Sequence, residues 1–359
     1  MPRKVTRRKI LEAGAATAGM FLGTGCDSDS RKQNTGREQI EKGPGREPFW
    51  NPGPDKNLVR NLTPGPTPVR MGIYLQYQED TDFDQMIKDF LKVGGTVRLT
   101  GAVTRPDGWN TLSTSRLNEF IDVLNQYDIE LFEVAGYCNI LHYDESVRQK
   151  NLAHLAQCIE FADRVGCRTV GTISGSRSPI GIKFIDNYNV HPDNWTLETW
   201  ELLVSGIKQV FKDTAGMKAA IGMEAQVTTN IDRPLAHRRL IDDVGDERMK
   251  VVLDPINMIS LHNYFHTTEL INECFDLLGE DIVVCHGKDT YVLPHSQTVH
   301  VQEVCTGRGI FDFESYLVRL SRMKWARTLW PDHIPDKDLP EAFAYIKKIA
   351  EKVGVTIYG

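Results

Sequence analysis

The stretch NLAHLAQCIEFADRVGCRTVGTIS (151–174) contains one helical pattern followed by one strand pattern, and the chain repeats this step. The apolar side chains of its first part fall on one face of a helix: Leu152, Leu155, Ile159, Ala162 and Val165. Gly166 follows where helices commonly end. RTVGTIS (168–174) then has the pattern of a short β-strand. A helix that leads directly into a strand is typical of an alternating α/β fold.

The same alternation extends from Met71 to the carboxyl terminus. The β-candidates are MGIYLQY (71–77), TVRLTG (96–101), IELFEVAGY (129–137), RTVGTIS (168–174), AAIGMEAQ (219–226), MKVVLD (249–254), DIVVCH (281–286) and ARTLWPD (326–332). Helical patterns lie between them, and those at 83–95 and 340–354 each close on a glycine. Eight βα units predict a (β/α)₈ TIM barrel over residues 67–359, with the active site at the carboxyl ends of its strands. A doubly wound sheet, the alternative, needs a glycine turn after the first strand, and YLQYQED (74–80) has none.

The amino terminus has the layout of an export signal over residues 1–26. Five cations in Met1–Lys9 precede a mostly apolar run, and Arg7-Arg8 lies directly before it, as in twin-arginine signals. LGTGC (22–26) resembles a lipoprotein cleavage box with Cys26 as the acylated residue. We therefore expect an exported protein of the periplasm or cell envelope, touching the membrane only through a lipid anchor at Cys26. The alternative is a disordered basic terminus. Residues 27–66 are rich in Pro and Gly and predict a flexible linker.

Composition excludes several other classes of protein. The chain has 359 residues, 41% of them hydrophobic, which is enough for a sizeable core. A formal charge of -6 argues against a nucleic-acid partner, because phosphate binding needs a clustered basic surface. The same charge argues against an AP-endonuclease barrel, which needs a basic groove. Seven cysteines without a CxxC pair suggest neither a zinc ribbon nor a dense disulfide framework.

Ionisable residues close four consecutive strands of the predicted barrel. These are Glu224, Asp254, His286 and Asp332. The carboxyl ends of neighbouring barrel strands converge on one point, so we expect the four side chains to meet there. Carboxylates with one imidazole suit a divalent ion. We expect one such ion, Mn²⁺ first, with Mg²⁺, Co²⁺, Fe²⁺ and Zn²⁺ as alternatives.

The motifs in this half of the chain resemble those of the sugar phosphate isomerase/epimerase family, the xylose-isomerase-like barrels. The resemblance lies in GMEAQ (222–226), VVLDPIN (251–257), VVCHGKD (283–289), VHVQEVCTGRGIFDF (299–313) and the segment 332–355, and residues 133–176 look like the third and fourth units of that family. It implies one divalent metal held by Glu224, Asp254, His286 and a carboxylate on strand eight. The family usually has Glu before His-Leu there, whereas here Asp332 precedes His333-Ile334. Asp is one methylene shorter, which leaves open a bond through water or none.

The resemblance also implies a chemistry. In such enzymes a metal chelates a carbonyl and the neighbouring hydroxyl, and a carboxylate removes the acidified carbon-bound proton. Glu224 and Asp332 would then be ligands that also act as base and acid on opposite faces of the carbon. His142 is an alternative base because it follows strand three, and its alternative role is a bond to the backbone at a helix entry.

Three further cations and polar groups are candidates for catalysis or substrate contact. Lys288 would neutralise an oxyanion or a carboxylate, unless it pairs with Asp289. Arg98, inside an apolar strand, needs an anionic partner, which is substrate or a structural carboxylate. Asn257 follows Asp254 by three residues and is a candidate substrate contact.

Loop residues after strands six and seven complete the candidate substrate contacts. His262, Glu303 and Arg308 belong to this group, with solvated or mutually paired side chains as the alternative. The long loops at 174–194 and 290–311 suggest a ligand larger than a triose. Trp195 and Trp330 either stack on a sugar ring or pack in the core.

Together these features predict an exported, metal-dependent sugar isomerase or epimerase that abstracts a proton next to a carbonyl of a small carbohydrate. A lyase that eliminates from an oxidised glycoside would use the same groups and is the first alternative. A tethered, non-catalytic carbohydrate-binding barrel is the second.

Overall fold

The computed structural model describes residues 63–76, 81–94, 100–104, 113–180, 188–293, 297–324 and 328–358. The predicted export signal, most of the predicted linker and Arg98 lie outside these residues. Within the described chain, no helix is both long and apolar enough to span a membrane.

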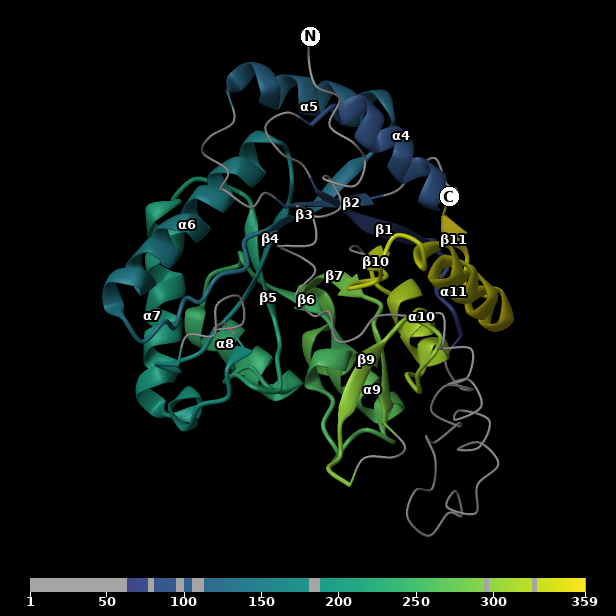
Figure 1. Cartoon of the computed structure of the whole chain (residues 1–359). Helices are drawn as coiled ribbons and strands as arrows, with labels where there is room; N and C mark the ends of the chain where they lie inside the picture. Colours follow the sequence, from purple (N-terminus) through teal and green to yellow (C-terminus); the bar gives the residue numbers. More distant parts are fainter. Residues whose placement is uncertain are drawn as a thin grey trace.

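A closed sheet of parallel strands forms the centre of the described chain (Figure 1). Its strands are β1 (Val69–Gln76), β2 (Thr100–Thr104), β3 (Glu130–Ala135), β4 (Thr169–Ile173), β5 (Ala220–Glu224), β6 (Met249–Leu253), β7 (Ile282–His286) and β10 (Thr328–Trp330). Each pairs with the next, and β10 pairs with β1 to close the ring. A short β11 (Ile357–Tyr358) adds to β1. The predicted TIM barrel is confirmed.

Helices follow the strands and surround the barrel (Figure 1). They are α4 (Phe83–Gly94), α5 (Thr114–Gln126), α6 (Glu145–Arg164), α7 (Leu197–Asp213), α8 (Pro234–Val244), α9 (Thr267–Leu278), α10 (Phe313–Ser321) and α11 (Leu339–Val353). Gly166 and Gly354 have φ of 71° and 74° just after α6 and α11, in the left-handed conformation that glycine adopts without strain.

The core has two parts. The larger lies between the strands and the helices, and a smaller one fills the barrel with Val252, Val284 and Trp330, against which Tyr74 and Phe132 pack. A Cβ at Gly72 would lie 1.6 Å from the Trp330 ring, so β1 has room for this indole only because residue 72 is glycine. Trp330 therefore packs in the core, and its predicted alternative role in sugar stacking is wrong.

Two local predictions need correction. β10 ends at Trp330, so Asp332 follows the strand instead of closing it. The expected loop at 290–311 contains an antiparallel hairpin of β8 (Asp289–Val292) and β9 (Val301–Val304). The hairpin forms because the carboxylate of Asp289 accepts the backbone N–H groups of residues 290, 307, 309 and 311, which binds the returning chain to the end of β7.

Two irregularities in strand register set the direction of buried side chains. In β3, Leu131 pairs with Gly101 and Glu133 with Ala102, so Phe132 is an extra residue. In β7, Ile282 pairs with Val251 and Val284 with Val252, so Val283 is extra. Such bulges rotate the residues that follow.

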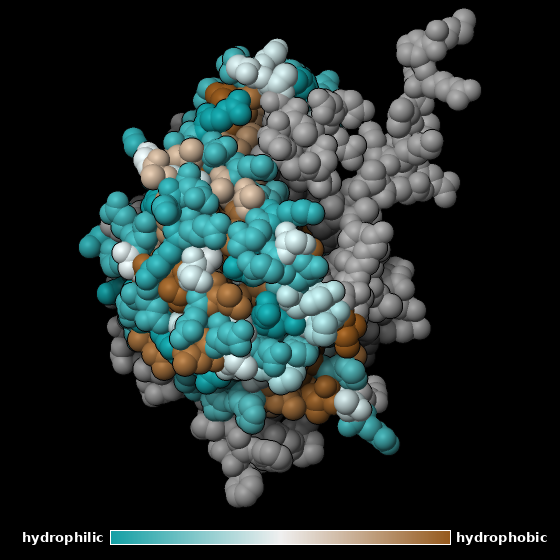
Figure 2. Space-filling model, turned by 90° about the vertical axis from the view of Figure 1, so that its left-hand side faces the viewer, coloured by the Kyte–Doolittle hydropathy of each residue, from teal (hydrophilic) through white to brown (hydrophobic). Residues whose placement is uncertain are grey.

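Exposed hydrophobic side chains in the described chain lie mainly in segments that follow barrel strands. They include Tyr143, Trp195, Leu235, Leu261 and Phe265. Figure 2 shows one side of the molecule, where hydrophobic patches are small islands in a mostly hydrophilic surface. Trp195 is 45% exposed and its indole N–H donates to Asp232 Oδ2 at 3.1 Å, so the ring is held in a fixed position on the surface.

Candidate metal centre

The carboxyl ends of β5, β6 and β7 bring Glu224, Asp254 and His286 together. Glu224 is the last residue of β5 and His286 the last of β7. Asp254 follows β6 and caps the 3-10 helix η5 (Pro255–Met258), accepting the Ile256 N–H. The three side chains are nearly inaccessible to solvent. Each offers one ligand atom, and these atoms all lie within 4.8 Å of one another.

Two buried atoms of this group lack a hydrogen-bond partner. They are Nδ1 of His286 and Oδ2 of Asp254, 3.7 Å apart, and Nδ1 also lies 3.8 Å from Glu224 Oε1. Buried polar atoms without partners are costly and rare in proteins. Two carboxylates and one imidazole gathered around a common point fit a divalent cation. A divalent metal site at these residues is therefore what the structure supports.

Lys288 and Asp332 lie next to this group. Lys288 Nζ is 3.1 Å from Asp254 Oδ2 and 3.0 Å from Asp332 Oδ2, and the ammonium side chain is only 2% exposed. The predicted alternative, a Lys288–Asp289 pair, is wrong, because Asp289 is occupied with backbone N–H groups. Asp332 Oδ2 lies 3.6 Å from His286 Nδ1, yet Asp332 does not belong to the three-residue metal group.

Charge pairing decides the protonation of both groups. Burial lowers the pKa of Lys288, but the facing carboxylates of Asp254 and Asp332 outweigh it and hold that pKa well above its ordinary value. Burial raises the pKa of Asp332, but His333, Lys288 and His286 bring it below the ordinary range. At neutral pH the site therefore contains an ammonium ion bonded to two carboxylates.

Both oxygens of Glu224 are held in place. Tyr137 donates its hydroxyl to Oε2 at 2.7 Å, and the amide of Asn257 donates to Oε1. Asn257 Oδ1 in turn accepts from Lys288 Nζ at 3.4 Å. Asn257, which the sequence suggested as a substrate contact, thus connects Glu224 to Lys288.

The remaining predicted residues lie at different places. His142 Nδ1 accepts the Asp144 N–H at 3.0 Å at the start of α6, which is its backbone-bonded alternative. His262 is exposed in the turn before α9. Arg308 bonds Glu341 and Asp338 at α11, whereas Glu303 bonds His333 Nδ1 at 3.0 Å and lies 3.8 Å from Lys288 Nζ. Glu303 therefore reaches the site, while Arg308 points to the helix.

Sequence reasoning missed several residues that line the site. Glu133 on β3 is fully buried 3.6 Å from His286 Nε2, and Tyr74 on β1 lies 3.0 Å from the same nitrogen. Tyr188, which follows β4, interacts electrostatically with Glu224 and Lys288. A signal existed for Glu133, since a charge inside an apolar β-run requires a partner.

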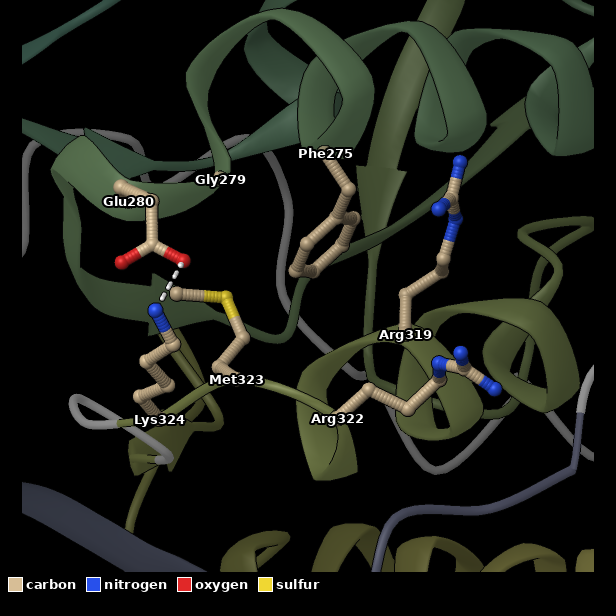
Figure 3. A pocket seen from close by; sticks show the side chains of 7 residues that line it. All are labelled: Phe275, Gly279, Glu280, Arg319, Arg322, Met323 and Lys324. Carbon is tan, nitrogen blue, oxygen red and sulfur yellow. Dashed lines mark ion pairs between the residues drawn. The ribbon is translucent and has the colours of Figure 1, made fainter.

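A separate pocket of about 150 Å³ lies where the chain enters β7 and β10, at the opposite ends of these strands (Figure 3). Its lining includes Arg319 and Glu280, and Lys324 pairs with Glu280 at 3.6 Å. This pocket contains none of the metal-site residues.

The family model described as "Xylose isomerase-like TIM barrel" matches residues 97–357. The chain belongs to this family. No curated protein matches the sequence.

Several solved structures have a similar fold. A xylose isomerase-like TIM barrel protein from Mycobacterium smegmatis in complex with magnesium has a TM-score of 0.57 at 15% identity, covering 82% of this chain and 98% of its own. An L-ribulose 3-epimerase has a TM-score of 0.58 at 13% identity, and the match covers 80% of this chain and 96% of the epimerase. Mannonate dehydratase from Streptococcus suis serotype2 has a TM-score of 0.56 at 12% identity, and the match covers 81% of this chain and 96% of the dehydratase. At these identities the likeness shows the fold alone.

Proposed function

We propose that this protein is a divalent-metal-dependent enzyme that acts on a small carbohydrate by removing a proton from the carbon next to a carbonyl. The observation that carries the proposal is the buried group of Glu224, Asp254 and His286, whose ligand atoms all lie within 4.8 Å of one another. Structural neighbours that include an L-ribulose 3-epimerase and a mannonate dehydratase support a carbohydrate substrate.

The residues divide the work between binding and proton transfer. A bound divalent ion would polarise the substrate carbonyl and acidify the adjacent C–H group. Glu224 is the base, because Tyr137 and Asn257 fix the plane of its carboxylate. Lys288 remains an ammonium ion and stabilises the negative charge that develops on the substrate oxygen. We expect Mn²⁺ in the site, and the magnesium bound to one neighbour makes Mg²⁺ the next candidate.

Isomerisation or epimerisation is the first candidate outcome, since it needs only return of the proton to a neighbouring atom or to the other face. Return to the other face requires a second acid. Asp332 is the available carboxyl group, and its contacts with His333 and Lys288 keep it ionised.

Elimination is the second candidate outcome, and the Lys288–Asp332 pair favours it. One base suffices to remove the proton in an elimination, and a leaving group then departs from the next carbon. The ionised Asp332 is no obstacle to that reaction. The dehydratase among the structural neighbours has the same fold.

Location remains a proposal from the sequence. We propose that residues 1–26 direct export by the twin-arginine route and that Cys26 carries a lipid anchor. Deletion of residues 1–26 should then move the protein from the membrane fraction to the soluble fraction. Recovery of the full-length chain in the cytoplasm with an uncleaved amino terminus would contradict the proposal.

Proton exchange tests the proposed chemistry directly. The Mn²⁺-loaded protein should transfer deuterium from D₂O into a carbon-bound position of one member of a panel of keto-sugars, sugar acids and 3-keto-glycosides. Glu224→Gln should reduce exchange to the background rate. Product analysis separates the two outcomes, because an epimer retains the atoms of the substrate and an elimination product lacks the leaving group. A metal-loaded protein that binds a sugar of the panel but exchanges no proton would support the non-catalytic barrel instead.

A further inference from the structure

The buried carboxylate of Glu133 has no task in the proton-transfer scheme. Glu133 lies in the middle of β3 and is 0% exposed, and its Oε2 atom has no hydrogen-bond partner. An uncompensated buried carboxylate is strongly unfavourable. Its presence therefore calls for a compensating group close by.

The fold makes room for this side chain. The extra residue Phe132 turns Glu133 into the barrel interior. On the neighbouring strand, a Cβ at Gly171 would lie 2.2 Å from Glu133 Oε1 and 3.1 Å from the Tyr137 hydroxyl oxygen. Glycine at position 171 thus leaves space for both polar groups.

One oxygen of Glu133 faces His286. Oε2 lies 3.6 Å from Nε2, while the other ring nitrogen, Nδ1, faces Glu224 and Asp254. A carboxylate beside Nε2 favours the tautomer that carries its proton there and leaves the lone pair on Nδ1. Tyr74 contacts the same nitrogen at 3.0 Å and can share this task.

The other oxygen of Glu133 faces Tyr137. Oε1 is 3.2 Å from the Tyr137 hydroxyl, which donates to Glu224 Oε2 over the shorter distance of 2.7 Å. The hydroxyl is therefore held between two carboxylates, and its position determines the orientation of Glu224.

We propose that Glu133 is a positioning residue that orients two of the three metal ligands, His286 directly and Glu224 through Tyr137. The inference rests on the metal site of the proposed function. Groups that hydrogen-bond metal ligands from behind fix their orientation, and their loss typically weakens metal binding about 10- to 100-fold. Glu133 has the burial, the free oxygen atom and the contacts for this role.

Metal affinity in Glu133→Gln tests the proposal without an activity assay. Gln has the same shape but no negative charge, so Co²⁺ bound in competition with a chelator should be held about 10- to 100-fold more weakly than by the wild type. The visible absorption of bound Co²⁺ should shift as its ligands reorient. The matched control is Glu130→Gln on the same strand, whose carboxylate pairs with Arg70 at 2.5 Å and should leave Co²⁺ affinity unchanged.

A second variant keeps the test valid if Glu133→Gln folds poorly. Gly171→Ala leaves Glu133 intact but pushes its carboxylate, and should weaken Co²⁺ binding in the same direction. Wild-type Co²⁺ affinity in a folded Glu133→Gln protein would overturn the proposal. If the wild type itself binds no Co²⁺, the proposed function fails as well, so the two failures are distinguishable.

Discussion

Strands β7 and β3 both contain a β-bulge that comes before a buried ionisable side chain. Each contains one extra residue, Val283 or Phe132, and each then directs a buried ionisable side chain into the barrel. His286 ends β7, where the sequence pattern changes from apolar to polar. Glu133 lies within β3, where the apolar pattern continues to Val134 and Ala135. An ionisable site residue is therefore easier to recognise from sequence at the end of a strand than in its middle.

Asp254→Asn should have the largest effect of the substitutions at the strand ends. It removes the charge of a ligand whose Oδ2 faces His286, and ligands must be deprotonated to bind metal. We expect loss of stoichiometric metal and of turnover together, measured by metal analysis and D₂O exchange. If Asp254→Asn retains about one ion per chain, Asp254 is not a metal ligand.

Lys288→Met should separate the catalytic role from the metal role. The ammonium is not a ligand, so metal content should stay at the wild-type level while turnover falls roughly 100-fold or more. The measurement is a parallel metal and exchange assay on the purified variant. Unchanged turnover in Lys288→Met would show that Lys288 has a structural role alone.

Asp332→Asn should have a smaller effect on metal binding than Asp254→Asn. Asp332 bonds Lys288 and lies outside the three-residue group, so we expect metal affinity to fall less than about 10-fold, below the range for groups that orient a ligand. Chelator competition on both variants compares them directly. Equal losses would make Asp332 a direct ligand, as the family resemblance implied.

His237 offers the smallest and most specific test, because it is a buried histidine outside the metal group. Its Nε2 bonds the Met223 carbonyl oxygen at 3.1 Å, and burial lowers the pKa of His237 to about 4. The folded state therefore holds it neutral, and the stability that depends on this is present above the unfolded pKa of about 6.5 and is lost as the pH falls toward 4. This shift corresponds to about 3 kcal/mol in the free energy of unfolding.

Urea unfolding of metal-free protein between pH 7 and 4.5 checks this linkage. The free energy of unfolding of the wild type should fall more steeply than that of His237→Gln. Parallel curves would show that His237 does not contribute to the acid sensitivity.

The sequence predicted the barrel because its evidence is repeated in each βα unit. The order of strands and helices follows from apolar periodicity and glycine ends, and Glu224, Asp254 and His286 converge because neighbouring strands share one edge. These features depend on local pattern, which a single sequence contains.

The missed features depend on contacts between distant segments. Glu133 enters the barrel only through the register of β3 against β2, and Gly171 on β4 provides its space. The β8–β9 hairpin requires Asp289 to bind N–H groups about 20 residues further along the chain. The end of β10 at Trp330 likewise depends on pairing with distant strands. Asp332 then lies beyond the strand and pairs with Lys288.

The metal content of the wild type beside that of His286→Ala tests the central claim most directly. Both proteins, saturated with Mn²⁺ and freed of excess ion by gel filtration, are measured by atomic emission. His237→Ala serves as the control for loss of a buried imidazole. We expect about one ion per chain in the wild type and in His237→Ala, and none in His286→Ala. Stoichiometric metal in a folded His286→Ala protein, or none in the wild type, would contradict it.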